Sequence, residues 1–234
     1  MVVAVIIFLA IFTQSAAGFG SALVAMPLLT GLVGIRTATP LVALVGFTSE
    51  LFLLVRYWSA FNWRAVGHLS AASVVGIPLG VYLLRRIDAD IVTTGLGLLL
   101  VGYALYALFG PTLPQLAHRA WAYGFGFVAG LLSGAYNTSG PPVVLYGNCR
   151  RWPPAEFKSN LQGFFLLNSL VTLPTHALNG NLTAVVWHNY WLALPAVALG
   201  LWIGSKLGDR LEPGRFRQVV LVLLIVLGLR LLLS

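Results

Sequence analysis

The feature that most constrains this chain is a series of long apolar stretches separated by short polar breaks. A helix needs about 20 residues to cross a bilayer, and the chain holds eight segments of suitable length. The breaks leave no room for a separate folded domain. The sequence therefore predicts an all-α, polytopic protein with about eight transmembrane helices in one integral membrane domain. The eight segments are Val2–Val33, Thr37–Tyr57, Trp63–Leu84, Ile91–Phe109, Trp121–Gly147, Phe157–Ala177, Val186–Leu207 and Phe216–Leu233.

The composition supports a membrane protein and argues against several other classes. The 234 residues are 59% hydrophobic and only 9% charged, whereas soluble domains carry about 25% charged residues. The net charge of +8 comes from cations in the short breaks, where they set membrane orientation, so we expect no nucleic-acid partner. One cysteine, Cys149, and four scattered histidines predict neither a disulfide nor a metal site. With no catalytic constellation and no nucleotide motif, we expect no enzyme activity and no cofactor.

An internal repeat divides the chain into two halves, residues 1–110 and 111–234. Gly76 and Gly80 match Gly200 and Gly204 at a constant spacing of 124 residues. Small residues four apart let membrane helices approach closely, so we interpret these four glycines as packing positions. We expect each half to contribute a repeat of four helices.

Each half opens with an apolar segment that glycine and proline interrupt. The first contains "GFGSALVAMPLL" and the second "SGAYNTSGPPVVLYG", and aligning them pairs Pro27 with Pro142. Interrupted segments at matching positions of two repeats indicate a transporter's binding site, because irregular backbone survives at membrane depth only beside protein or a water-filled cavity. Helix N-termini attract anions, and the side chains of the second interruption are neutral donors. The pattern favours a small anion over a metal cation, which would require carboxylates.

The number of crossings has two solutions. If each interrupted segment crosses once, the chain crosses eight times and the repeats are parallel. If each is a re-entrant hairpin, each half crosses three times and the repeats are inverted. Cations divide ten against three under either topology, so the positive-inside rule does not decide. We favour eight crossings, because about thirty residues at 1.5 Å each fit one tilted span better than two complete passes. The first segment lacks the charged start of a signal peptide, so we expect it in the mature protein.

The chain resembles the TauE/SafE family of membrane transporters, the sulfite exporters, over nearly its whole length. The similarity lies in "GFGSALVAMPLL", "GIRTATPLVAL", "AFNWR", Gly130–Gly134 and Gly140–Val144. Gly18, Gly20 and Ser21 stand where the family often has a run of glycines, and Tyr136 to Thr138 replace part of a second one. The resemblance implies export of a small organosulfur compound or sulfur oxyanion.

The candidate substrate-binding residues come from the two interruptions and from one polar residue in the sixth segment. Glu50 is the one acid well inside an apolar segment, and an intramembrane ionisable residue indicates function. We assign it to proton coupling or gating, with a pairing to Arg56 as the structural alternative. Lys158 is a second coupling or gating candidate, unless it only snorkels to the interface. The substrate-binding candidates are Gly18, Gly20, Ser21, Pro27, Asn137, Thr138, Ser139, Gly140, Pro141 and Asn168.

The predicted function is secondary transport of a small anion, such as sulfite or an organosulfonate, with export the expected direction. The expected location is the bacterial inner membrane, with the anion and the lipid bilayer as partners and a homodimer left open. Access would alternate as one half or bundle rocks against the other. The alternatives are a passive anion channel, in which the interruption forms a selectivity filter, and a membrane protein with no transport role.

Overall fold

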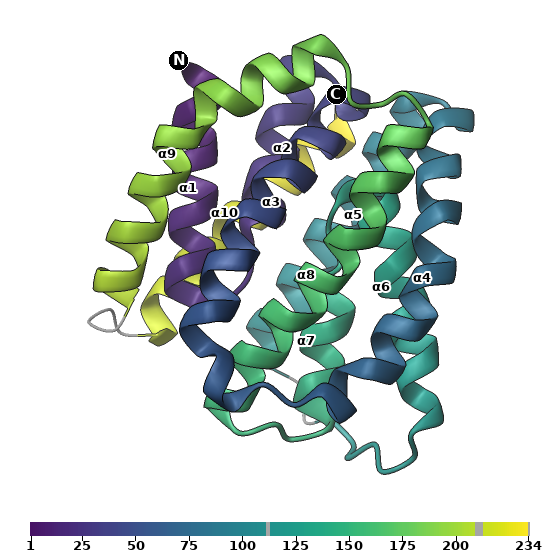
Figure 1. The fold of residues 1–234 in the computed structure, drawn as a ribbon, viewed down its shortest axis with the longest axis vertical. Helices are drawn as coiled ribbons and strands as arrows, with labels where there is room; N and C mark the ends of the chain where they lie inside the picture. The colour runs from purple at the N-terminus through teal and green to yellow at the C-terminus, as the bar shows by residue number, and fades with distance from the viewer. Residues whose placement is uncertain (111–112, 209–212, 234) are drawn as a thin grey trace.

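The computed structural model describes residues 1–110, 113–208 and 213–233, and these ranges fold into α-helices with one short 3₁₀ helix (Figure 1). The all-α fold predicted from the apolar segments is confirmed, with ten α-helices in the described ranges. They are α1 (Val2–Ala17), α2 (Ser21–Val33), α3 (Ile35–Tyr57), α4 (Trp63–Arg86), α5 (Ala89–Phe109), α6 (Ala120–Tyr136), α7 (Gly140–Cys149), α8 (Pro154–Leu178), α9 (Ala184–Gly208) and α10 (Pro213–Leu233), with η1 (Trp58–Ala60) after α3.

Within the described residues, four helices are long and apolar enough to cross a membrane. They are α3 together with η1, α4, α5 and α9. Helix α8 is as long as α9 but more polar, and its polar side chains face the protein interior. The buried polar residues of α8 are Ser159, Asn160, Gln162, Asn168, Ser169, Thr172 and His176.

The first interrupted segment is a hairpin whose two outer ends lie at the same end of the bundle. Helix α1 runs parallel to α9, because Phe8 lies against Gly200 and Phe12 against Gly204. Helix α1 therefore begins at the upper end in Figure 1, where α9 begins. Helix α2 returns to this end, since it leads into the start of α3, which hydrogen-bonds to the end of α4.

The second interrupted segment, α6 and α7, is a hairpin that enters from the opposite end. Helix α6 runs parallel to α4, with Gly126 against Leu69 and Gly134 against Ile77. Helix α7 then returns to where α6 began. The guanidinium of Arg150, directly after α7, donates to two backbone carbonyls just before α6, at 2.7 and 2.9 Å.

The eight crossings expected in two four-helix repeats are therefore not confirmed. The four hairpin arms have 16, 13, 17 and 10 residues. At 1.5 Å per residue they measure about 15 to 26 Å, less than the hydrocarbon core of about 30 Å. The expectation compared one tilted span with two complete passes. Two partial arms, as in the re-entrant alternative, fit the same length of chain, because neither arm has to cross the whole hydrocarbon core.

The two halves interlock, because each hairpin packs against a helix of the other half. A Cβ atom at Gly200 of α9 would lie 3.0 Å from the carbonyl oxygen of Phe8, and a Cβ at Gly76 of α4 would meet the carbonyl of Phe127. The prediction that these glycines serve close packing is confirmed. Phe8, which lies against Gly200, and Phe127, which lies against Gly76, are 119 residues apart.

The same spacing relates other parts of the two halves. The first residues of α3 and α8, Ile35 and Pro154, are 119 apart, as are the first residues of α2 and α7, Ser21 and Gly140. Pairing Pro27 with Pro142 was therefore wrong by four residues. The boundary expected at residue 111 lies outside the described residues.

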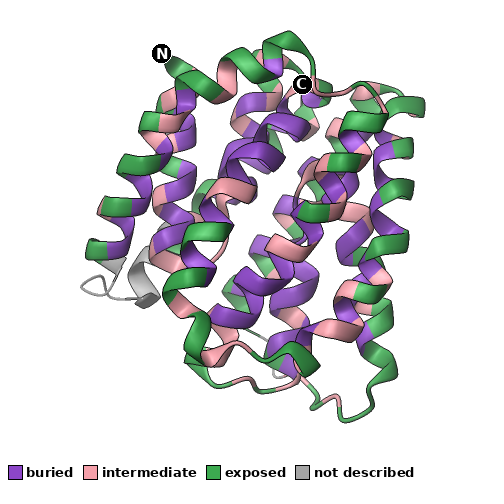
Figure 2. Ribbon diagram, viewed as in Figure 1, coloured by how far each residue is buried: buried purple, intermediate pink, exposed green. Residues whose placement is uncertain are grey.

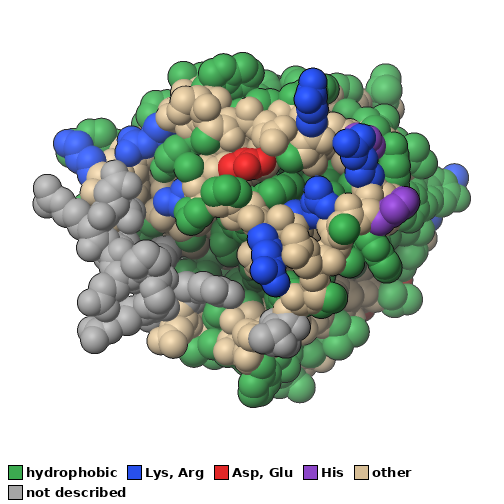
Figure 3. Space-filling model, turned by 90° about the horizontal axis from the view of Figure 1, so that it is seen from below, with side chains coloured by type: hydrophobic (Ala, Val, Ile, Leu, Met, Phe, Trp, Pro, Cys, Tyr) green, Lys and Arg blue, Asp and Glu red, His purple; other side chains and the backbone are tan. Residues whose placement is uncertain are grey.

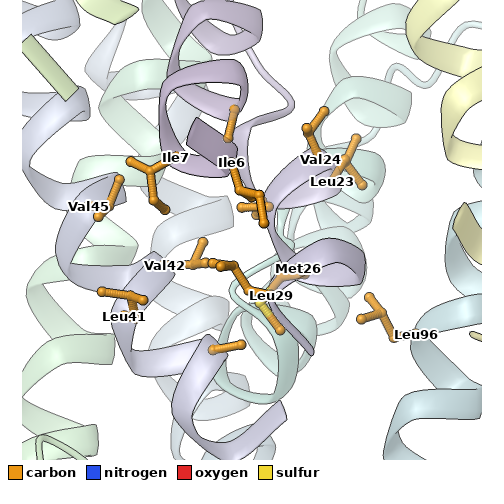
Figure 4. Close-up of a cluster of buried hydrophobic side chains, with 14 of the residues drawn as sticks. Ile6, Ile7, Leu23, Val24, Met26, Leu29, Leu41, Val42, Val45 and Leu96 are labelled. Carbon is orange, nitrogen blue, oxygen red and sulfur yellow. The ribbon is translucent and has the colours of Figure 1, made fainter. Parts of the chain in front are cut away.

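A buried apolar core holds the first hairpin against α3 and α5 (Figure 4). Ile7 of α1, Leu29 of α2, Leu41 of α3 and Leu96 of α5 are all fully buried there. Burial of each such side chain contributes roughly 1.5 to 3 kcal/mol in water, and in lipid the same contacts act through packing instead. Figure 2 shows the buried residues concentrated on the central helices, with exposed residues on the outer faces of α4 and α9.

Candidate functional site

The tips of the two hairpins have backbone conformations that few residues tolerate. Gly18 directly follows α1 with φ 86°, and Gly20 directly precedes α2 with φ 106°. Asn137 directly follows α6 with φ 49°, a left-handed conformation that asparagine adopts more readily than most residues. The glycines and the asparagine of the interruptions thus produce chain reversal at both tips.

The two tips meet around a small polar cavity between α3 and α8. Its volume is about 30 Å³, enough for about two water molecules. Residues of the first hairpin, the second hairpin, α3 and α8 all contribute. The lining residues are Gln14, Gly20, Ser21, Ala22, Leu23, Glu50, Ser133, Asn137, Thr138, Ser139, Gly140, Phe165, Asn168 and Ser169.

The structure brings most of the sequence-predicted site residues to this cavity. Those that line it are Gly20, Ser21, Glu50, Asn137, Thr138, Ser139, Gly140 and Asn168.

Four of the predicted residues lie elsewhere. Gly18 is at the first tip, where its carbonyl accepts a hydrogen bond from the amide of Gln162. Pro27 is buried inside α2, and Pro141 lines an apolar pocket formed mainly with α5 and α6. Lys158 is half-buried, with its Nζ 5.9 Å from the ring centre of Tyr57.

The backbone donors come from the first hairpin more than from the second. The first N–H groups of a helix have no partner within it, so α2 offers the amides of Ser21, Ala22 and Leu23 at the cavity. Helix α7 begins Gly-Pro-Pro, and prolines have no N–H. The second tip therefore presents mainly side chains, a division that the sequence argument did not anticipate.

Among the buried side chains of the lining, Asn168 carries an amide group that is only partly hydrogen-bonded. Its Oδ1 accepts from the Ser73 hydroxyl at 2.6 Å, but its Nδ2 has no partner among the described residues. The residue is only 2% exposed, and a buried donor without an acceptor costs about 1 to 3 kcal/mol. An amide group held in this state at a cavity is suited to a ligand that accepts hydrogen bonds.

Among the described residues that line the cavity, Glu50 is the only charged one. It is 6% exposed, and the Ser169 hydroxyl donates to its Oε2 at 2.6 Å. The alternative considered for Glu50 was a pairing with Arg56, whose guanidinium instead donates to the carbonyl of Ser205 at 3.5 Å.

Sequence reasoning missed six lining residues, of which three are polar, namely Gln14, Ser133 and Ser169. Gln14 and Ser133 each lie one turn before a tip, so a search limited to the interruptions excluded them. Gln14 accepts from the Ser49 hydroxyl at 3.3 Å and donates to Gln162 at 3.3 Å. Gln14 and Ser133 could have been found in the sequence, because both are polar residues within an apolar run and they are 119 residues apart.

The chemistry of this lining does not resemble a metal or cofactor site. In the described part of the chain no group of three His, Cys, Asp or Glu residues comes together. The cavity presents a set of N–H and O–H donors and a single carboxyl group, at the point where the tips of two helical hairpins meet. Helical hairpins that enter from opposite ends and meet at a polar cavity are features of a membrane transport protein.

Comparison with known proteins identifies the family. The family model described as sulfite exporter TauE/SafE matches residues 3–231. The chain is 28% identical over 229 residues to the "Probable sulfite/organosulfonate exporter TauE" of Cupriavidus necator, covering 95% of this chain and 89% of that protein. It is 27% identical over 176 residues to the "Probable inner membrane transporter protein TsaS" of Comamonas testosteroni, covering 73% and 72%. No solved structure matches the chain.

The chain belongs to the sulfite exporter TauE/SafE family, which confirms the resemblance of its sequence. It is a multi-pass transporter of the bacterial inner membrane and not an enzyme.

Proposed function

We propose that this protein exports a small oxyanion, sulfite or a compact organosulfonate, and binds it between the two hairpin tips. The observation that carries the proposal is the buried, unpartnered amide of Asn168 at the cavity. The backbone amides at the start of α2 add donors from the other side. The name of the relative from Cupriavidus necator supports sulfite and organosulfonates as the first compounds to test.

The small volume of the cavity bears on the choice within this class. About 30 Å³ suits sulfite, with four heavy atoms, better than an organosulfonate that carries a long chain. Several lining side chains are nearly inaccessible to solvent, among them Gln14 at 1% and Thr138 at 1%. Such enclosure favours a carrier with an occluded site over a channel, which would need a continuous path.

We also propose a membrane topology for these elements. Helices α3, α4, α5, α8, α9 and α10 cross the membrane, and the two hairpins enter from opposite sides as parts of inverted repeats formed by residues 1–110 and 111–234. The opposite directions of the hairpins and the recurring spacing of 119 residues support this arrangement. The homodimer stays a prediction.

The orientation follows from the described cations. Seven belong to the lower end in Figure 1, namely Arg56, Arg64, Arg119, Arg150, Arg151, Lys158 and Lys206, and four to the upper end, namely Arg36, Arg85, Arg86 and Arg230. Figure 3 looks onto the lower end, where lysine and arginine side chains are spread among apolar ones. By the positive-inside rule this face is cytoplasmic.

The test is flux of radiolabelled sulfite, and then of sulfoacetate, in proteoliposomes. Wild type is compared with a variant in which Asn137, Thr138 and Ser139 are all alanine. The control is Asn189→Ala on α9, a half-buried asparagine whose amide donates to the Val185 carbonyl of its own helix at 2.9 Å.

We expect saturable flux with counterflow in wild type and control, and at least a tenfold loss in the triple variant at equal amounts of folded protein. Equal flux in all three proteins would remove the tips from the binding site. Flux that neither saturates nor shows counterflow would favour the channel.

A further inference from the structure

We propose that Glu50 is the proton-binding group of this transporter and that one proton crosses with each anion. This inference rests on the proposed function. Its starting point is a conflict within the cavity, which offers hydrogen-bond donors to an anion but also contains the carboxyl group of Glu50. The described residues of the lining include no lysine, arginine or histidine that could compensate its charge.

The conflict disappears when Glu50 carries a proton. In a site shielded from water, two negative charges in contact repel far more strongly than in bulk solvent, and a buried charge without a partner is costly. Protonation turns the carboxylate into a neutral acid that can donate a hydrogen bond to the anion. Anion binding and proton binding at Glu50 therefore favour one another. The proton bound on one side of the membrane leaves on the other side after the anion departs.

The charged and titratable groups of the surrounding helices have other contacts. Helices α1 and α2 carry no charged side chain. On the remaining elements packed against α3, five titratable groups contact residues other than Glu50. Tyr190 of α9 bonds to the Thr48 hydroxyl, His176 of α8 bonds to Asn181, Lys158 of α8 lies over Tyr57, Tyr136 of α6 approaches Gly95, and Tyr103 of α5 packs on Phe19.

The position of Glu50 in the interlocked fold allows a single carboxyl group to bind and release a proton on both sides of the membrane. Glu50 and Ser169 are 119 residues apart, the spacing that relates α3 to α8, and they hydrogen-bond to each other at 2.6 Å. Glu50 and Ser169 therefore occupy equivalent positions in the two halves, and the pair lies where the halves meet. A group at such a position faces equivalent surroundings when the cavity is open to either side, so it can load and release a proton at both.

The test uses voltage-clamped proteoliposomes with radiolabelled sulfite and an imposed pH gradient. Sulfite itself titrates and leaks across lipid, so wild type is compared with Glu50→Gln, a neutral mimic of the protonated acid in which these background effects are unchanged. With the outside acidic, we expect wild type to accumulate about tenfold more label than the variant for each pH unit of gradient, the ratio for one proton per anion. Sulfite counterflow, which moves no net proton, should persist in Glu50→Gln.

A second variant exchanges the two residues, Glu50→Ser with Ser169→Glu, and we expect it to recover the response to the gradient that Glu50→Ser alone loses. An equal gradient response in wild type and Glu50→Gln would overturn the proposal, as would accumulation when the inside is acidic. An exchange variant that performs counterflow but ignores the gradient would overturn the symmetric role of the pair. Absence of any saturable sulfite flux in wild type would instead refute the proposed function, and the coupling with it.

Discussion

Replacing Asn168 by leucine separates a role in anion binding from a role in folding. The two side chains are similar in size, and the change removes a buried N–H donor that has no partner, which saves about 1 to 3 kcal/mol. It also removes the hydrogen bond from the Ser73 hydroxyl, worth about 1 kcal/mol net. That hydroxyl retains the Ser70 carbonyl at 2.8 Å, so no new group is left unpaired. The expected change in unfolding free energy is between about zero and 2 kcal/mol in the stabilising direction.

Asn160 provides a matched control on the same helix. It is fully buried, but both ends of its amide are paired, with Oδ1 accepting from the Asn62 backbone N–H at 2.9 Å and Nδ2 donating to Glu156 at 3.3 Å. Asn160→Leu leaves the Asn62 N–H without its acceptor. We expect it to destabilise the protein by about 1 to 3 kcal/mol.

Thermal unfolding in detergent and sulfite flux in proteoliposomes, measured on the same preparations, check both changes. Asn168→Leu should unfold at or above the wild-type temperature and lose at least tenfold in flux. Asn160→Leu should unfold at a lower temperature, with flux per folded molecule largely retained. If Asn168→Leu lowers the unfolding temperature as far as Asn160→Leu, or transports normally, the assignment of its amide to the anion is refuted.

Two further predictions concern the fold. Gly130→Ala places a Cβ 2.7 Å from the Ser73 Cα atom and should destabilise the protein by about 1 to 3 kcal/mol. Gly124→Ala on the same helix meets nothing within 4 Å and should be neutral or stabilising. Thermal unfolding measures both, and equal effects would contradict the close α4–α6 contact. The second prediction uses single cysteines, Val2→Cys or Leu32→Cys, in a Cys149→Ser background, at the exposed outer ends of the first hairpin. Both cysteines should react with an impermeant maleimide added to the same side of the membrane. A first segment that crosses the membrane would instead expose one cysteine on each side.

The sequence predicted those features that depend on local pattern. Gly76 and Gly200 were recognisable as packing positions because small residues at helical spacing produce close contact in almost any membrane helix pair. The hairpins were not predictable in the same way. Gly18 and Gly20 permit an interrupted straight span as readily as a reversal, and the choice between them depends on which helix each arm packs against.

The candidate site was predicted in part for a related reason. Asn137 and its neighbours were recognisable because polar residues beside prolines are unusual at membrane depth. The contact between Glu50 and Ser169 joins residues far apart in the chain, and only the interlocking of the halves brings them together. Ser169 on its own gives no signal, because serine is common in membrane helices as a packing residue.

Interlocking also decides which parts of the protein can move together during transport. Rocking one half against the other would pull α1 from α9 and α6 from α4, the two interfaces where glycines bring backbones into contact. Such interfaces resist sliding, because packed side chains and backbone leave no free volume. The tips contact α8 through hydrogen bonds instead, as Gly18 does with Gln162, and water can replace these during movement. We therefore expect the moving unit to be a hairpin together with its partner helix from the other half, so that each tip opens or closes the cavity with the helix that carries it.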